Sequence, residues 1–431
     1  MALVDDQGQR VLEEGGPYPA PFTDPEGWRQ GLIDRIQGIE APLRQRIGAI
    51  ALDGTSGTLL LCHPDGQLLE GELGQALPYH RACPEQVGAA SALAGSAAMA
   101  AGASGSLARA LALLEQASQL GHRPGSLWLR HQADWLMGWL LGDWRWGEEG
   151  NNLRLGWLLS EGGGAEGRWA GAIGEQPWSS ALPRICASGT PLGPLHERTA
   201  AQLGLPADCL VMAGTTDSNA GVLAADPGPE DGITVLGTTL VLKQFSPRPL
   251  RAAGVSCHRL AGRWLVGGAS NAGAGILRRF FDDATVAALS RQIDPERPSG
   301  LALRPLLGRG ERFPVDDPAL EPQLEPRPVS DALYLQALLE GLTAIERAGW
   351  ERLRQLGLPP VRRVITLGGG AHNPQWRSLR QRSLGVPVLN RPQLSAALGM
   401  ARLALRGRRL SQSSGPQRHP AEPNCSSLPP A

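Results

Sequence analysis

The sequence predicts a protein of the α/β class. Apolar runs rich in β-branched residues alternate with helical patterns along most of the 431 residues, and small glycine-containing turns join them. Such alternation is typical of sheets that are covered by helices. A chain of this length has material for two or three domains. The segment "DPGPEDG" at 226–232 predicts a linker between two halves.

The first half begins with a predicted hairpin and a helix. "MALVDDQGQRVLEE" fits a strand, a turn with one glycine and a second strand. A helix is expected from Pro25, with Asp24 as its N-cap. Trp28, Leu32 and Ile36 then fall on one face, which predicts the buried side of that helix.

The remaining elements of the first half follow in order. "IALDGTSGTLLLC" at 50–62 predicts strand, turn and strand. "SLARALALLEQASQLG" predicts a helix that ends at Gly121. Trp135, Trp139, Trp144 and Trp146 are candidates for stacking on a sugar, but the helical spacing of Trp135 and Trp139 favours core packing for these two. "DCLVMAGTTDSNAGVLAA", at 208–225, predicts a strand, a Gly-Thr-Thr-Asp turn and a helix.

The second half repeats this alternation and ends in a polar tail. Four segments predict further strands and helices: 232–245 (strand, Gly-Thr-Thr turn, strand), 262–281 (strand into a glycine-rich helix start), 330–357 (a long helix with one leucine stripe) and 361–385 (strand, triple-glycine loop, helix). Asn373 is the expected N-cap of the last helix, followed by Pro374. From Leu410 onward the residues are mostly Ser, Pro, Gln and Asn, which predicts disorder.

Composition excludes several classes of function. Forty-one basic residues balance 41 acidic ones, so nothing favours a nucleic acid or an acidic membrane as partner. The six cysteines form no CxxC pair, which argues against a zinc or iron–sulfur site and suits a reducing cytosol. "MALVDDQGQR" lacks the apolar region of a secretory signal, so a cytoplasmic location is expected. The small-residue stretch 91–114 is interrupted by Arg109 and is interpreted as a loop and a packed helix, not as a membrane span.

Four short turns at the ends of predicted strands are the main indication of a ligand-binding site. They are residues 53–57, 214–217, 237–239 and 368–370. Glycine lets a backbone approach a ligand closely, and successive N–H groups with threonine hydroxyls can line an anion site. One such turn is common in ordinary hairpins. Four of them, spread over both halves, predict a cleft for a phosphorylated ligand, with plain structural turns as the alternative.

Asp217 is the candidate catalytic residue. It lies between a predicted strand and helix, where the positive helix N-terminus favours the ionised carboxylate. Such a carboxylate can accept the proton of a hydroxyl that attacks a γ-phosphoryl group. The alternative is that Asp217 only caps its helix.

These segments resemble a known family. "AGTTDSNAGVLAA", "TVLGTTLVLK", "GGASNAGAGILRRFF" and "TLGGGAHNPQWRSL" are similar to the FGGY family of carbohydrate kinases, and the resemblance covers nearly all of residues 1–408. "AIALDGTSGTLLLC", "YHRACPE", "HQADWL" and "GERFPVDDP" resemble the D-ribulose kinases of cyanobacteria and plants, a branch close to the xylulokinases.

The resemblance implies an actin-like ATPase fold of two ribonuclease-H-like domains with a central cleft. Residues 1–225 would form the sugar-binding domain, 231–408 the ATP-binding domain, and 410–431 a disordered tail. The implied activity is phosphorylation of a ketopentose by ATP with Mg²⁺, D-ribulose to D-ribulose 5-phosphate in the first place. D-Xylulose as the substrate, or a non-catalytic pseudokinase that binds sugar or nucleotide, stay open. Both implied substrates are small molecules, and the oligomeric state is not predicted.

The resemblance also assigns roles to residues. Asp217 would be the general base; no metal ligand is identified, with Asp217 the one candidate. ATP would contact one set of residues: Gly237, Thr238, Thr239, Gly368, Gly369, Gly370 and Asn373. The sugar would contact another: Asp53, Ser56, Ser218, Tyr79 and His80, with Thr55 as a further candidate. The alternatives are a self-contained hairpin for Asp53 and Ser56, and surface packing for Tyr79 and His80. Lys243, the single lysine, is interpreted as a solvated strand residue in preference to a phosphate contact.

One part of the family pattern is absent. The family has a D-x-G-T-S loop after its first strand, whereas "MALVDDQGQ" matches the second strand. The similar turn at 53–57 follows the first helix and is therefore assigned to the sugar side. A gap or an exposed edge is expected in the first sheet. There are two explanations for the missing loop. Either the start codon is assigned too far downstream, or the chain is a weakened or inactive kinase.

Overall fold

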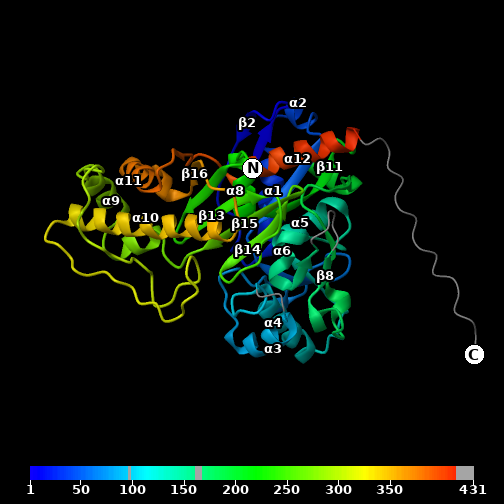
Figure 1. Cartoon of the computed structure of the whole chain (residues 1–431). Helices are drawn as coiled ribbons and strands as arrows, with labels where there is room; N and C mark the ends of the chain where they lie inside the picture. The colour runs from blue at the N-terminus through cyan, green and yellow to red at the C-terminus, as the bar shows by residue number, and fades with distance from the viewer. Residues whose placement is uncertain (96–98, 161–166, 414–431) are drawn as a thin grey trace, which may run out of the picture.

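The computed structural model describes residues 1–95, 99–160 and 167–413. Figure 1 shows two lobes. The first lobe (residues 1–225) holds the blue and cyan parts of the chain, and the second lobe (residues 231–395), which includes the yellow helix α10, extends to its left. The last helix, α12 (Ala396–Ser413), returns to the first lobe and packs against β1, β3 and α8.

The chain begins with the predicted hairpin, β1 (Ala2–Val4) and β2 (Arg10–Glu13), followed by α1 (Pro25–Gln37) and α2 (Ala41–Arg44). The expected cap is confirmed, because the Asp24 carboxylate accepts a hydrogen bond of 3.0 Å from the Glu26 N–H. Trp28 and Ile36 are buried on the predicted face of α1, and Leu32 is partly buried.

The central sheet of the first lobe positions the site. Its strands lie in the order β10 (Pro191–Pro194), β11 (Leu210–Thr216) and β3 (Ala49–Gly54), and β11 runs parallel to β3. A Cβ at Gly214 would lie 1.6 Å from the Leu52 carbonyl oxygen, so only glycine permits this approach. The ends of the two strands therefore lie side by side, and α8 (Asp217–Ala225) starts there.

The expected gap in the first sheet is present. The β1–β2 hairpin forms a separate two-stranded sheet, and within the described ranges β3 pairs with β11 alone. A cavity of about 960 Å³ separates β1 from β3, lined by Ala2–Val4 on one side and Ala49–Asp53 on the other. Residues of α1 and α12 also line this cavity.

The rest of the first lobe consists of small sheets and helices around a second core. The strands are β4 (Leu59–Cys62) paired with β5 (Trp128–His131), β6 (Trp146–Glu148) with β9 (Arg184–Cys186), and β7 (Trp157–Leu159) with β8 (Gly167–Trp169). The helices are α3 (Val87–Ala94), α4 (Ser106–Gln119), α5 (Gln132–Leu141), α6 (Glu149–Asn152) and α7 (Glu197–Leu203). Trp135 and Trp139 are buried on α5, which confirms the core interpretation.

The second lobe is a six-stranded sheet with helices packed on it. Its order is β14 (Val255–Leu260), β15 (Arg263–Ala269), β13 (Leu240–Ser246), β12 (Asp231–Leu236), β16 (Arg363–Leu367) and β17 (Val388–Asn390). Its helices are α9 (Asp283–Ser290), α10 (Asp331–Gln355) and α11 (Pro374–Leu384). The leucine stripe of α10 is fully buried, as predicted, and Asn373 caps α11 through the Trp376 N–H (2.9 Å).

Two predicted element boundaries are wrong. The glycine-rich segment after β15 forms only a short 3-10 helix, Ala274–Arg279. Its glycines approach the turn at 237–239 closely, since a Cβ at Gly273 would lie 2.3 Å from the Thr238 carbonyl oxygen. The predicted disorder from Leu410 is also wrong for its first residues, because α12 continues to Ser413. The remainder of that tail lies outside the described residues.

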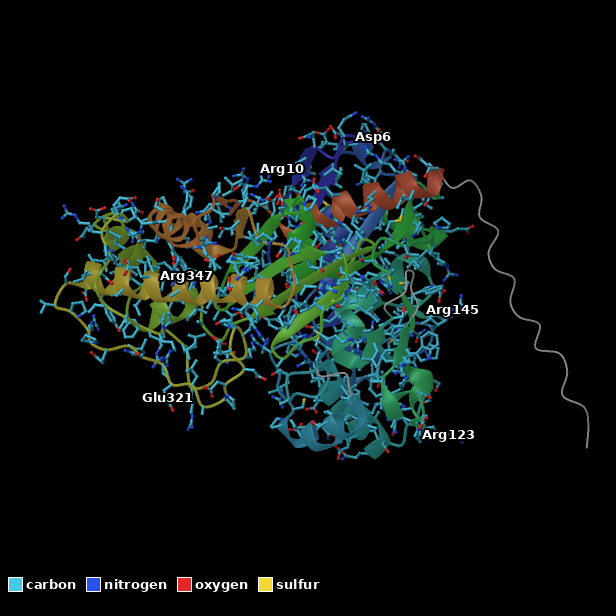
Figure 2. The ribbon with its side chains drawn as sticks, in the orientation of Figure 1. Asp6, Arg10, Arg123, Arg145, Glu321 and Arg347 are labelled. Carbon is cyan, nitrogen blue, oxygen red and sulfur yellow. The ribbon has the colours of Figure 1, made fainter. Side chains whose placement is uncertain are left out.

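Charged side chains of both signs are distributed around the molecule. Figure 2 shows Asp6, Arg10, Arg145 and Glu321 at separate places on the surface. All four are exposed, which agrees with the balanced composition. Within the described ranges, no helix is both long and apolar enough to span a membrane.

Candidate active site

Asp217 lies at the end of the central sheet of the first lobe. Thr216, not Asp217, caps α8, because the Thr216 hydroxyl accepts from the Asn219 N–H at 3.4 Å. The capping alternative for Asp217 is therefore wrong. Its half-buried carboxylate accepts from the Ser218 N–H at 2.6 Å. Burial raises the pKa of Asp217, while the Ser218 N–H, Lys243 and Arg154 oppose that shift.

Asp53 is the second carboxylate at this edge. The register aligns Thr215 with Asp53 on the parallel pair β11–β3. Burial, and then the charge of Asp217, raise the pKa of Asp53 to about 6. Tyr18 also belongs to this group and was not identified from the sequence. The residue as a whole is 48% exposed, but burial and the nearby Asp53 raise the pKa of its hydroxyl. Its loop, "GGPYPA", carries no pattern that would have identified it.

Gln132, the first residue of α5, holds the turn at 53–57 in place through hydrogen bonds. The Gln132 side-chain oxygen accepts from both the N–H and the hydroxyl of Thr55, each at 3.0 Å. The Thr55 and Thr58 hydroxyls share a further hydrogen bond of 2.6 Å. Thr55 therefore has a structural role in this turn, while Asp53 and Ser56 are partly exposed beside it.

Arg109 ties three loops together. Its buried guanidinium donates to the carbonyl oxygens of Gly57 (2.8 Å), Tyr79 (3.1 Å), Arg81 (2.7 Å) and Ser104 (3.0 Å). The sequence identified Arg109 only as an interruption of an apolar stretch. The contact brings the Tyr79 loop to the turn at 53–57.

Tyr79 and His80 are both exposed. Their rings stack edge to face with centroids 5.2 Å apart. The contact leaves both side chains exposed at the surface of their loop, and their predicted contact with the sugar stays a prediction.

The second lobe presents two turns at one sheet edge. Strands β12 and β16 are parallel, with Val235 aligned to Leu367, so residues 237–239 and 368–370 follow strand ends that lie together. A Cβ at Gly368 would lie 2.8 Å from the Leu236 carbonyl oxygen, which shows how closely these turns approach. The Ala274 N–H donates to the Gly237 carbonyl oxygen at 2.9 Å and supports the first turn.

Asn373 uses its side chain for structure. Its amide oxygen caps α11, and its amide nitrogen donates to the Ser290 hydroxyl at 2.8 Å. The side chain is therefore engaged at both ends beside the triple-glycine turn.

Lys243 connects the two lobes. It lies on β13 and is 5% exposed, so its interpretation as a solvated residue is wrong. Its ammonium donates to the Ser218 carbonyl oxygen (3.0 Å), the Ser218 hydroxyl (2.6 Å) and the Asn219 side-chain oxygen (2.8 Å). The first turn of α8 thus contacts the sheet of the second lobe directly.

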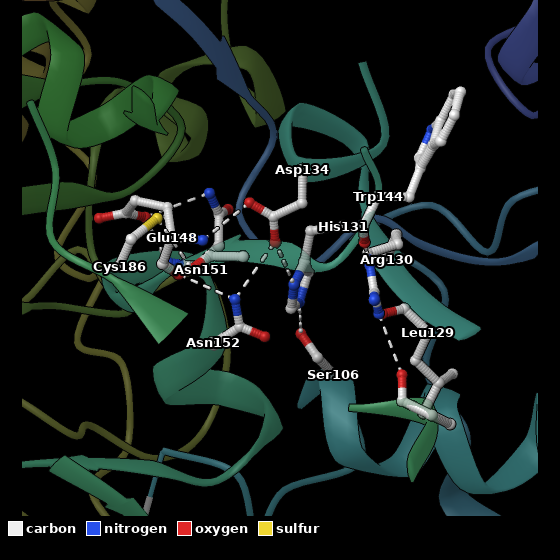
Figure 3. A network of polar contacts seen from close by, with 12 residues as sticks. Ser106, Leu129, Arg130, His131, Asp134, Trp144, Glu148, Asn151, Asn152 and Cys186 are labelled. Carbon is white, nitrogen blue, oxygen red and sulfur yellow. Dashed lines mark hydrogen bonds and ion pairs between the residues drawn. The ribbon is translucent and has the colours of Figure 1, made fainter. Parts of the chain in front are cut away.

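The first lobe also contains a network of buried polar side chains, which Figure 3 shows. The Ser106 hydroxyl contacts His131 Nε2 at 3.0 Å, and His131 Nδ1 lies 3.5 Å from the Asp134 carboxylate. This order resembles a Ser-His-Asp triad, but all three residues are at most 1% exposed, so no substrate reaches them. The group has a structural role.

The network continues toward Asp217. The Asp134 carboxylate accepts from the Glu148 N–H at 2.9 Å, and Glu148 accepts from the Thr215 hydroxyl at 3.4 Å. Burial and the neighbouring Glu149 raise the pKa of Glu148 well above its usual range. The end of β11, directly before Asp217, is therefore held in place by contacts within the lobe.

Comparison with known proteins finds a family match in the second half of the chain. Residues 232–407 match the C-terminal domain of the FGGY family of carbohydrate kinases. A putative sugar kinase of Bacillus subtilis (strain 168), YoaC, is 32% identical over 90 residues, a segment that spans 20% of this chain and 18% of that protein.

Solved structures superpose on most of the chain. A xyloylose kinase from Brucella ovis superposes with a TM-score of 0.79 at 20% identity, over 95% of this chain and 88% of that one. A xylulose kinase from Lactobacillus acidophilus gives 0.73 at 16% identity, over 95% and 86%. The expected fold class is confirmed: the chain has the two-domain α/β architecture of the FGGY sugar kinases, the actin-like ATPase fold. The family match concerns residues 232–407, and the superpositions extend the same fold over 95% of the chain.

A divalent metal would come with the nucleotide. Within the part of the chain that the structure describes, no group of three or more His, Cys, Asp or Glu side chains could hold a metal ion. Mg²⁺ is commonly bound through substrate phosphates, water and one or two carboxylates.

Proposed function

We propose that this protein is a kinase that transfers the γ-phosphoryl group of Mg–ATP to a terminal hydroxyl of a ketopentose. The observation that carries the proposal is the Asp217 carboxylate, which starts α8, does not cap it and adjoins Lys243 of the second lobe. D-Ribulose is the first candidate substrate, because the sequence resembles that branch of the family.

The proposed chemistry is a single displacement. The Asp217 carboxylate accepts the proton of the sugar hydroxyl, whose oxygen forms a bond to the γ-phosphorus. The bond from that phosphorus to the β–γ bridging oxygen breaks, and ADP leaves. The turns at 237–239 and 368–370 would hold the nucleotide, and Asp53, Ser56, Ser218, Tyr79 and His80 would contact the sugar. Positioning and charge stabilisation provide most of the rate in such reactions.

D-Xylulose is the second candidate substrate. The two solved structures named above are described as a xyloylose kinase and a xylulose kinase, and their likeness to this chain supports testing that sugar. A cytoplasmic location remains a prediction from the sequence.

The deciding experiment measures ADP release with Mg–ATP alone, with D-ribulose and with D-xylulose. We expect pentulose-dependent ADP release from the wild type and a fall of 10²- to 10⁴-fold in Asp217→Asn, the range that removal of a general base produces. Asp208→Asn, at an exposed site outside the turns, is the matched control and should retain the wild-type rate.

The outcomes separate the candidates. The sugar with the larger kcat/KM identifies the substrate. A wild type that binds sugar or nucleotide without releasing ADP would instead support the pseudokinase. An active Asp217→Asn variant would remove Asp217 from the mechanism.

A further inference from the structure

Lys243 is the one lysine among 431 residues, and it lies in the interior of the protein. On β13 it is aligned with Ile233 of β12 on one side and Gly267 of β15 on the other, so its backbone belongs to the middle of the sheet. A buried ammonium is costly unless its donors are satisfied. The strand alone does not explain why a lysine stands at this buried position.

The surroundings of Lys243 satisfy the charged form completely. An ammonium has three donors and no acceptor. Its three acceptors all come from Ser218 and Asn219, the two residues that follow Asp217. Burial lowers the pKa of Lys243 to about 7, and the nearby Asp217 charge opposes that shift.

Helix stability does not explain the contact. The N-terminus of a helix carries a partial positive charge, so a cation there is unfavourable. The other groups near Lys243 supply no counter-charge either. Burial, followed by Lys243 and Arg154, lowers the pKa of His258 to about 3, which keeps that imidazole neutral. Arg154 is itself a cation, so the carboxylate of Asp217 is the anion that faces Lys243.

We propose that Lys243 is a positioning residue: its ammonium holds the first turn of α8, and with it the Asp217 carboxylate, against the sheet of the second lobe. The inference rests on the proposed function of Asp217. The phosphate-side turn at 237–239 directly precedes β13 in the chain. One side chain therefore fixes the spacing between the base and the part of the second lobe that would hold ATP.

The kinetic test compares Lys243→Met with Lys243→Arg. Methionine has a similar length but no charge, and we expect kcat to fall at least 100-fold while the sugar KM changes less than threefold. Arginine keeps the charge and should recover at least tenfold of that loss. Arg130→Met is the matched control: it also removes a buried cation, one whose partners are backbone carbonyls of the first lobe. It should lower the melting temperature without lowering kcat.

Two kinetic results would overturn the inference. One is a Lys243→Met variant with kcat within threefold of the wild type. The other is an equal loss of kcat in Lys243→Met and Arg130→Met, since that would trace the effect to stability alone. A wild type without pentulose-dependent ADP release is a different result, because it rejects the proposed function.

A second measurement does not depend on activity or on the folding of Lys243 variants. Because the chain has one lysine, labelling with [ζ-¹⁵N]lysine gives a single side-chain signal. We expect a protonated ammonium at pH 6 whose protons exchange slowly and whose chemical shift changes in Asp217→Asn. Rapid exchange like that of a free amine, or a signal unaffected by Asp217→Asn, would reject the coupling between the two residues.

Discussion

At the scale of single residues, the Asp53 carboxylate lowers the stability of the folded protein at neutral and higher pH. Its pKa of about 6 in the folded protein lies above the ordinary value of 3.8, because the carboxyl is buried near Asp217. A carboxyl that binds its proton more tightly when folded stabilises the protein below pH 3.8, and that contribution is lost as the pH rises through 6. At pH 8 the folded state therefore carries an unfavourable buried charge.

This predicts a pH-dependent effect of Asp53→Asn. The variant lacks the charge, so its melting temperature should exceed that of the wild type at pH 8, and the difference should shrink toward pH 4. Thermal unfolding of both proteins at several pH values measures this, with Asp208→Asn as the exposed control. The same difference at pH 4 and pH 8 would contradict the assignment.

The sequence predicted where the candidate residues lie in the fold better than it predicted their contacts. Asp217 was identified from its position between a strand and a helix, but Thr216 and Asp217 are both suitable caps, and the pattern could not decide between them. Lys243 was misjudged because its acceptors lie 24 and 25 residues earlier, on the other lobe. Such contacts depend on how the lobes pack, which no local pattern contains.

At the scale of elements, Arg109 of α4 connects loops that no regular secondary structure joins. Replacing it with methionine would leave four carbonyl oxygens without their donor, at a cost of about 1–3 kcal/mol for each that stays buried and unpaired. We expect Arg109→Met to lower the unfolding free energy and to raise the sugar KM about tenfold, with little change in the KM for ATP.

Arg109→Lys is the informative comparison. Lysine keeps the charge but lacks the planar fork of donors, so it should fall between methionine and the wild type. Urea unfolding and steady-state kinetics with each substrate varied provide the measurements. An unchanged sugar KM in Arg109→Met would show that these loops do not shape the sugar site.

Local signals predicted most elements because the caps and apolar stripes are local. Asp24 and Asn373 cap their helices as expected, and α10 buries the predicted leucine stripe. The errors arose where tertiary contact decides. The glycines after β15 serve close packing on the turn at 237–239, and α12 extends beyond Leu410 as its last turn.

At the scale of the whole molecule, a buried ion pair joins the lobes. Glu149 of α6 accepts from Arg259 of β14 through two nitrogens, at 3.1 Å and 2.7 Å, and both side chains are at most 6% exposed. Burial raises the pKa of Glu149, and Arg259 opposes that rise. Removing one partner from a buried pair typically costs about 3–5 kcal/mol, because the other charge stays buried.

We therefore expect Glu149→Gln to destabilise the protein more than the double variant Glu149→Gln/Arg259→Met does. Urea unfolding of the singles and the double gives the coupling between the two sites. Glu351→Gln, which breaks the exposed pair with Arg354, should leave the unfolding midpoint unchanged. Additive losses at Glu149 and Arg259 would show that the pair does not link the lobes energetically.

The cavity between β1 and β3 has a consequence for how the interior exchanges hydrogen with water. Successive backbone amides of a strand point to opposite edges, so alternate N–H groups of β3 face β11 and the rest face the cavity. In deuterated buffer, β3 should show a two-residue rhythm, with slow exchange at the amides bonded to β11 and fast exchange at those between them. Residue-resolved exchange measures this, and uniform protection along Ala49–Gly54 would contradict it. Although β3 lies inside its lobe, half of its amides would then exchange with solvent as fast as those of a strand at the edge of a sheet.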